Sequence, residues 1–264
     1  MALLLAITIG AAGVSQVGAA GGPHGPYSAL TDACAACHRT HTAGGRALIS
    51  SADEIQLCLT CHNGTGSIYN AALGEITAAG KSAPSSAGPL QLTSEDGPAT
   101  SAHILGTPFD VPGGPRATVS ITCEDCHDPH GNTNYRLLRN RMTWNDLNAA
   151  VNFTATVTRP GTLQEKVAYK GGSVQLCAAC HVDYGRHTGG QFSGGVRHDV
   201  NVKVSDKYFP ADLPLENGQL VCLTCHAAHG TRVINTAGGS SSLSTALKRR
   251  GDWGVCSQCH FDRP

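Results

Sequence analysis

Cysteine and histidine are the residue types of this sequence whose spacing indicates chemistry. The chain of 264 residues contains 12 Cys and 13 His. All the cysteines fall into repeated copies of one pattern, C-x-x-C-H, with none left over. The copies are Cys34, Cys37 and His38; Cys58, Cys61 and His62; Cys123, Cys126 and His127; Cys177, Cys180 and His181; Cys222, Cys225 and His226; and Cys256, Cys259 and His260.

This pattern is the attachment motif of c-type haem. Two thiols add to the two vinyl groups of one porphyrin, and the His that follows lies under the iron as its proximal ligand. A disulfide scaffold does not place His after every second Cys, zinc sites do not need His there, and redox C-x-x-C motifs do not occur in sixes. The sequence therefore predicts six covalently bound haem c groups, with the 12 Cys as thioether ligands and the six motif His as proximal ligands.

The remaining histidines supply the second axial ligands. Seven are left: His24, His41, His103, His130, His187, His198 and His229. The only methionines are Met1 and Met142, so axial sulfur is scarce, and we expect low-spin, bis-His iron at low potential. We predict His24, His41, His103, His130, His198 and His229 as distal ligands. His187 is then either a free surface residue or an alternative ligand.

Three of these histidines recur at one offset. His41, His130 and His229 each lie three residues after a proximal His. Residues three apart on a helical turn lie on neighbouring faces, so one turn is expected to serve two irons. An upstream His, a C-x-x-C-H-x-x-H motif and a plain C-x-x-C-H motif together form a repeat. We predict dihaem unit 1 at residues 20–100, unit 2 at 101–190 and unit 3 at 191–264.

The N-terminal segment predicts export. Residues 3–14 form an apolar run too short to span a bilayer, and small residues lead to Ala19 and Ala20. We interpret residues 1–19 as a signal peptide, although no Lys or Arg precedes the run; a buried helix is the alternative. The mature chain is expected to have no membrane span and to lie at the cell surface or outside the cell, or alternatively in the periplasm.

The composition argues against an ordinary side-chain core. Leu, Ile, Val and Phe make up just under a fifth of the chain, while 32 Gly and 13 Pro favour turns. Lys plus Arg and Asp plus Glu both number 19, which argues against nucleic-acid binding and against a highly charged disordered chain. We expect a mostly irregular, loop-rich fold with short α-helices and a few short β-strands, filled by haem. Strands are expected at 151–158 and 200–204, and linkers at 78–102 and 236–245.

Arginine follows the second His of each unit, as Arg46, Arg136 and Arg232. These side chains either pair with haem propionates or are ordinary surface charge.

From His24 to His260, the sequence resembles the multihaem c-type cytochromes with doubled C-x-x-C-H motifs, and in particular the OmcS-type and OmcE-type filament cytochromes. The resemblance implies six haems stacked in a chain, polymerisation of protomers, and one distal His supplied by a neighbouring protomer. If each upstream His serves the preceding unit, His24 would bind a haem of the next protomer. If each serves its own unit, the monomer is closed.

The function expected from these residues is electron transfer without enzymatic turnover. The first hypothesis is an extracellular filament that conducts electrons, with itself, other cytochromes or extracellular acceptors as partners and with no nucleic acid. A periplasmic shuttle or a subunit of a membrane oxidoreductase uses the same residues. A multihaem reductase is the least favoured reading, because it needs an open iron position and the spare histidines are enough to fill all six.

Overall fold

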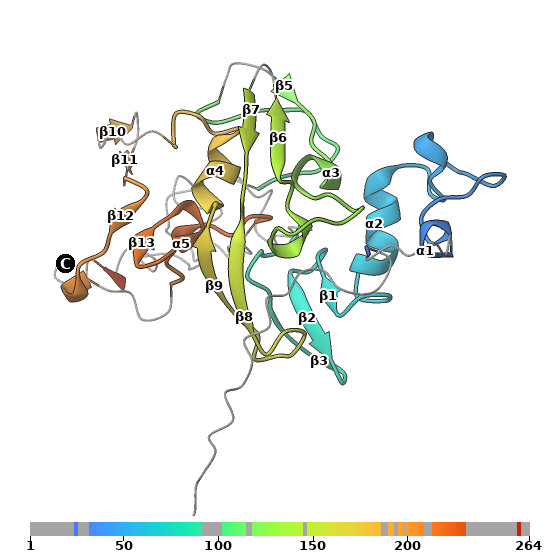
Figure 1. Ribbon diagram of the computed structural model, residues 1–264, viewed down its shortest axis with the longest axis horizontal. Coiled ribbons are helices and arrows are strands. Elements are labelled where there is room, and N and C mark those ends of the chain that lie inside the picture. Colours follow the sequence, from blue (N-terminus) through green and yellow to red (C-terminus); the bar gives the residue numbers. More distant parts are fainter. Residues whose placement is uncertain are drawn as a thin grey trace, which may run out of the picture.

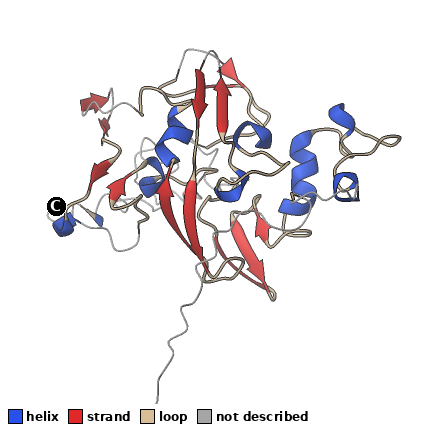
Figure 2. Ribbon diagram, viewed as in Figure 1, coloured by secondary structure: helices blue, strands red, loops and turns tan. Residues whose placement is uncertain are grey.

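Irregular backbone dominates the part of the chain that the structure describes. The computed structural model describes residues 24–25, 32–90, 102–114, 118–144, 147–185, 190–192, 195–197, 199–208, 213–230 and 258–259. Short helices and short antiparallel hairpins are joined by long loops (Figure 2). The loop-rich fold with few regular elements is therefore confirmed.

The helices are short and most carry a cysteine motif. Five α-helices lie within the described residues: α1 (Asp32–Ala35), α2 (Glu54–His62), α3 (Cys123–Cys126), α4 (Ser173–Ala178) and α5 (Cys222–Cys225). Three 3₁₀ turns are η1 (Arg46–Leu48), η2 (Tyr135–Leu137) and η3 (Asp206–Tyr208). The longest helix, α2, begins after Asp53, whose carboxylate accepts a 2.8 Å hydrogen bond from the backbone N–H of Gln56. No helix among the described residues is long and apolar enough to cross a membrane.

The strands form small antiparallel sheets. One sheet has three strands in the order β1 (Tyr69–Asn70), β2 (Glu75–Ala78) and β3 (Lys81–Pro84). The others are two-stranded: β4 (Phe109–Asp110) with β5 (Thr118–Val119), β6 (Arg141–Trp144) with β7 (Leu147–Ala150), β8 (Thr154–Thr158) with β9 (Lys166–Gly171), β10 (Gly190–Phe192) with β11 (Gly195–Arg197), and β12 (Val202–Lys203) with β13 (Gln219–Leu220).

The predicted strands exist but are shorter than expected. The strand predicted at 151–158 begins at Thr154, because the backbone before it bonds to loops: the N–H of Val151 donates to Asn140 and the carbonyl of Phe153 accepts from Tyr135. The strand predicted at 200–204 is reduced to β12. The predicted linker at 78–102 contains β3, and residues 91–101 lie outside the described part, as does the linker at 236–245.

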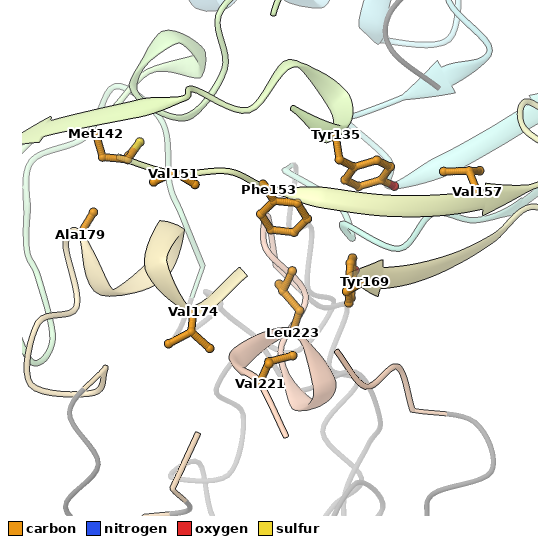
Figure 3. Packing of buried hydrophobic residues seen from close by; sticks show 10 residues of the cluster. All are labelled: Tyr135, Met142, Val151, Phe153, Val157, Tyr169, Val174, Ala179, Val221 and Leu223. Atoms are coloured by element: carbon orange, nitrogen blue, oxygen red, sulfur yellow. The ribbon is translucent and has the colours of Figure 1, made fainter. Parts of the chain in front are cut away.

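One apolar cluster joins the segments predicted as units 2 and 3. It lies around Phe153, whose ring is 5.8 Å from those of both Tyr135 and Tyr169 between centroids (Figure 3). Val221 and Leu223 of unit 3 extend it. Its other members are Met142, Val151, Val157, Val174 and Ala179. Ten buried residues make a small cluster for a chain of this length, in keeping with the limited side-chain core that the composition predicts.

The helices of unit 1 lie apart from this cluster. In Figure 1, α1 and α2 form a lobe on one side of the molecule, next to α3 of unit 2. Helix α2 packs against α3, and α4 packs against α5, so the second motif of one unit contacts the first motif of the next.

Candidate metal centres

Each of the five cysteine motifs that the structure describes in full is held by one turn of helix. The N–H of the motif His donates to the carbonyl of the first Cys, at 2.8 Å for His38, 2.9 Å for His127 and His181, and 3.0 Å for His226. This i to i−4 bond brings both thiols and the imidazole to one end of the turn. With the C-x-x-C-H spacing, one helical turn can therefore present two thiols and one imidazole to a single haem.

The helix does not continue to the second His of the H-x-x-H motif. Helix α3 ends at Cys126, and His127 is already extended, with φ −113° and ψ 146°. His226 is extended in the same way after α5. The expectation that both histidines share a helical turn is wrong. A non-helical turn nevertheless directs His127 and His130 toward different partners.

Eight imidazoles face one another in four pairs. Ring centroids are 6.1 Å apart for His24 and His62, 6.2 Å for His38 and His130, 6.0 Å for His103 and His181, and 6.3 Å for His127 and His229. Each pair joins one predicted proximal ligand to one predicted distal ligand.

These separations fit one metal between two imidazoles. A metal–imidazole bond of about 2 Å, plus about 1.1 Å from the nitrogen to the ring centre, puts two opposed centroids about 6 Å apart. Aromatic contacts without a metal also span about 4.5–7 Å between centroids, so the argument rests on this spacing together with the pairing of a predicted proximal with a predicted distal ligand in all four cases. The four pairs therefore have the spacing that a six-coordinate, bis-His iron requires.

The ring nitrogens on the other side are also occupied. In seven of these eight imidazoles, Nδ1 lies 2.6 to 3.3 Å from a backbone carbonyl oxygen. The carbonyls belong to Pro129 for His24, Ala47 for His38, Tyr69 for His62, Ala228 for His103, Arg136 for His127, Pro112 for His181 and Gly88 for His229. A metal-bound His characteristically donates its second N–H in this way, which leaves Nε2 for the metal.

Burial keeps several of these rings neutral. It lowers the pKa of His62, His103 and His127 below the ordinary value, and it lowers the pKa of His229 to about 4. A neutral imidazole is the form that binds a metal, so the environment favours ligation at neutral pH.

The pairs follow a rule along the repeat. The second His of a unit faces the first motif of the unit before it: His130 faces His38, and His229 faces His127. The upstream His faces the second motif of its own unit, as His24 faces His62. His103 and His181 repeat this arrangement in unit 2. Of the two assignments considered from the sequence, the geometry favours upstream histidines that serve their own unit, and it does not direct His24 toward another protomer.

The remaining histidines are only partly described. His41 is exposed, and no imidazole lies opposite its ring within the described residues. His226 is also exposed. His187, His198 and His260 lie outside the described part of the chain. Met142 packs in the apolar cluster at 6% exposure and offers no sulfur to these pairs.

Thiols of successive motifs lie next to each other. The sulfurs of Cys58 and Cys123 lie within 4.8 Å of each other, and the thiols of Cys177 and Cys222 are close enough to shift each other's pKa, upward for Cys177 and downward for Cys222. The carboxylate of Glu54 joins the first of these contacts, with all three ligand atoms within 4.8 Å of one another, and accepts a 2.7 Å bond from the N–H of Glu124. Groups attached at the second motif of one unit and the first motif of the next are therefore neighbours.

Backbone acceptors are the functional groups that the sequence patterns missed. The predicted linker at 78–102 includes Ala87 and Gly88, whose carbonyls accept from the N–H and Nδ1 of His229. A carbonyl has no side-chain signature, so no motif points to it.

Arg136 is not an exposed charge. Its guanidinium lies 2.5 Å from the carboxylate of Glu165, and its own carbonyl accepts from His127. Ala47 is its counterpart in unit 1, because its carbonyl accepts from His38 at the same offset of nine residues. Arg136 therefore corresponds in the repeat to Ala47, and not to the neighbouring Arg46.

Comparison with protein families agrees with this chemistry. Residues 24–67 and 115–147 match the family described as doubled CXXCH motif. The first match covers His24 and both motifs of unit 1, and the second covers the first motif of unit 2. No curated protein and no solved structure matches the chain. The family matches support a multihaem protein with covalently attached haem, of the kind that transfers electrons.

Proposed function

We propose that this multihaem c-type cytochrome is an electron conduit, in which six bis-His haems pass electrons along the chain. The observation that carries the proposal is the set of four imidazole pairs about 6 Å apart, each joining a proximal and a distal His. Haem, when bound, supplies an iron that takes up and releases one electron.

The residues of the chain contribute saturated and rigid coordination. The motif Cys would hold each porphyrin through thioethers, and the paired imidazoles, most of them oriented by backbone carbonyls, would bind its iron from both sides. Because neither ligand has to leave when the oxidation state changes, little reorganisation accompanies electron transfer. The same saturation argues against a reductase, which needs an open position for its substrate.

Adjacent attachment sites support a continuous path. The contact between Cys58 and Cys123 brings the second and third predicted haems together, and the contact between Cys177 and Cys222 does the same for the fourth and fifth. Cys180 is near Cys126, which connects the third and fourth. The second to fifth predicted haems would then follow one another in space in the order of their motifs in the sequence.

Continuation of the pairing rule supports a filament. The second His of a unit faces the first motif of the preceding unit. The residue just before this second His also contacts the upstream His of the preceding unit through its backbone carbonyl. Pro129 accepts from His24 in this way, and Ala228 accepts from His103. His41 is the second His of unit 1, which has no preceding unit in its own chain. The same rule pairs it with the first motif of unit 3 in a second copy, whose proximal ligand is His226, and both residues are exposed. Such a head-to-tail contact repeats without closing and builds a fibre.

This proposal replaces His24 by His41 as the ligand shared between protomers. His24 already faces His62 in its own chain, and its Nδ1 is 3.0 Å from the carbonyl of Pro129.

A filament of this kind would be extracellular and would pass electrons to other cytochromes or to external acceptors. The alternative is a periplasmic shuttle, with the same haems in a discrete molecule.

The conduit is tested on haem-loaded protein by haem quantification and electron paramagnetic resonance. We expect six haems per chain, all low-spin in the resting protein. A stoichiometric high-spin signal would contradict saturated coordination and favour an enzyme.

The filament is tested by electron microscopy of the haem-loaded protein and two variants. We expect His41→Ala to give discrete particles with one high-spin haem per chain. His24→Ala should also lose one low-spin haem but still form filaments. Filaments of His41→Ala with six low-spin haems would rule out this junction, and discrete wild-type particles with six low-spin haems would favour the shuttle.

A further inference from the structure

A buried carboxylate lies between two of the candidate haem sites. Glu165 occupies the turn between β8 and β9, and its side chain is 2% exposed. One of its oxygens accepts from the guanidinium of Arg136 at 2.5 Å. The other accepts from the hydroxyl of Tyr69 at 2.6 Å and from the N–H of Gly161 at 2.8 Å. No motif identified in the sequence includes Glu165.

The two side chains that Glu165 holds belong to residues that orient axial ligands. The backbone carbonyl of Tyr69 accepts from His62, and the carbonyl of Arg136 accepts from His127. Glu165 therefore connects the segment behind one proximal His of unit 1 with the segment behind one proximal His of unit 2. The motifs of these two histidines are the ones whose thiols, Cys58 and Cys123, lie in contact.

The charge of Arg136 reaches both sites. Its guanidinium carbon lies 4.0 Å from the centre of the Tyr69 ring, and its Nε donates to the hydroxyl of Tyr135 at 2.8 Å. The carbonyl of Arg136 itself accepts from the Nδ1 of His127, and the carbonyl of Tyr69, whose ring the guanidinium covers, accepts from the Nδ1 of His62. A cation in this position acts on both irons through a medium of low dielectric constant.

We propose that Glu165 is a positioning residue that sets the reduction potentials of the second and third haems, by balancing the charge of Arg136 and fixing the segments behind His62 and His127. The proposal rests on the proposed function, since it requires haem at both motifs. Glu165 belongs to no C-x-x-C-H motif and to none of the four imidazole pairs, so its role would be exerted through Arg136 and Tyr69.

The sign of the effect follows from electrostatics. Oxidised haem iron carries one more positive charge than reduced iron, so an uncompensated cation nearby favours reduction. Loss of the Glu165 charge leaves Arg136 as such a cation, in a site where a lone charge is poorly solvated. Loss of the Arg136 charge has the opposite effect. Removal of both charges should largely restore the balance.

The test is a redox titration of the haem-loaded protein and of three variants. We expect Glu165→Gln to favour reduction of two of the six haems by about tenfold, which is 59 mV for a one-electron couple. Arg136→Gln should shift the same haems to lower potential. The double variant should lie near the wild type, because a charge effect cancels whereas structural damage adds. Glu75→Gln, on the half-buried strand β2, is the control and should change nothing.

The outcomes separate this inference from the proposed function. If wild type and Glu165→Gln are both low-spin but have the same potentials, the role of Glu165 is wrong and the conduit stands. The role is also wrong if Glu165→Gln lowers the potentials, or if the double variant departs further than either single variant. A resting wild-type protein with high-spin haem would contradict the conduit itself.

Discussion

His127 and His229 face each other across two units of the repeat, with their ring centroids 6.3 Å apart. The carbonyl of Gly88, from unit 1, accepts from the Nδ1 of His229, so three units meet at this pair. An iron bound here would tie together segments that are far apart in the sequence. Metal binding and tertiary structure are thus expected to depend on each other throughout this chain.

Replacing His229 by Met should change one haem and leave the others as they are. A thioether in an axial position raises the potential relative to imidazole, so His229→Met is expected to add one component at higher potential in a redox titration. The ring of His229 is half-buried, and the flexible Met side chain fits irregular space of similar size.

Ser82→Met is the control for this replacement, since Ser82 is exposed on β3 and is not a candidate haem ligand. It should leave the potentials of all haems unchanged. A shift of several haems in His229→Met would show that the substitution disturbs the fold, and no shift would remove His229 from the ligand set.

Two glycines with similar backbone angles provide a matched test of the loop behind His229. Gly88 has φ +76°, and a Cβ added there would lie 1.9 Å from the carbonyl oxygen of Gly230. Gly80 has φ +73°, but a Cβ there would meet nothing within 4 Å. Gly80→Ala should therefore cost only the backbone strain, about 1 kcal/mol. Gly88→Ala should cost several times more and should displace the carbonyl that orients His229.

The measurements are the denaturant midpoint and the low-spin signal of both haem-loaded variants. Gly88→Ala is expected to reduce the low-spin content by one haem, while Gly80→Ala keeps all of it. Equal stability losses in the two variants would mean that the contact with Gly230 does not constrain this loop.

The sequence predicts the composition of these sites better than their pairing. Spacing within a motif is local, and one helical turn explains why Cys123 and His127 act together. Which distal His meets which proximal His depends on how distant segments fold back, and no local pattern carries that information. From the sequence, His24 could serve a haem of its own unit or a haem of another protomer. The position of its ring opposite His62 favours the first alternative.

The errors in the strand predictions have a similar origin. Val151 and Phe153 alternate with exposed Asn152, which is the pattern of a strand. Both are buried in the apolar cluster, yet their backbone groups bond to the loops at Asn140 and Tyr135 instead of to a neighbouring strand. The alternation of apolar and polar residues at 151–153 reflects burial in the cluster, while the hydrogen bonds to distant segments keep this stretch out of a strand.

Phe153 is expected to be the most sensitive residue of the apolar cluster. It is 1% exposed and packs between Tyr135 and Tyr169. Phe153→Ala should lower the free energy of unfolding by about 3–5 kcal/mol, because it removes an aromatic ring and leaves a cavity. Denaturation of the haem-loaded protein followed by circular dichroism measures this loss.

The control is Val202→Ala in β12, where the side chain is 42% exposed and the expected change is within about 0.5 kcal/mol. A loss below 1 kcal/mol for Phe153→Ala would mean that the bound haems, and not this cluster, determine the stability of units 2 and 3.

The haem-free chain should not fold cooperatively. Large apolar side chains next to the candidate sites are exposed, with Leu48 at 50% and Ile104 at 49%. Burial of such surface is the main driving force of folding, and here covalent haem would have to supply the covering surface. We expect chain produced without haem attachment to show a far-ultraviolet circular dichroism spectrum of a largely disordered protein, and no sigmoidal transition in urea. A steep transition with a slope typical of a domain this size would contradict this, and would assign the fold to the side-chain cluster around Phe153.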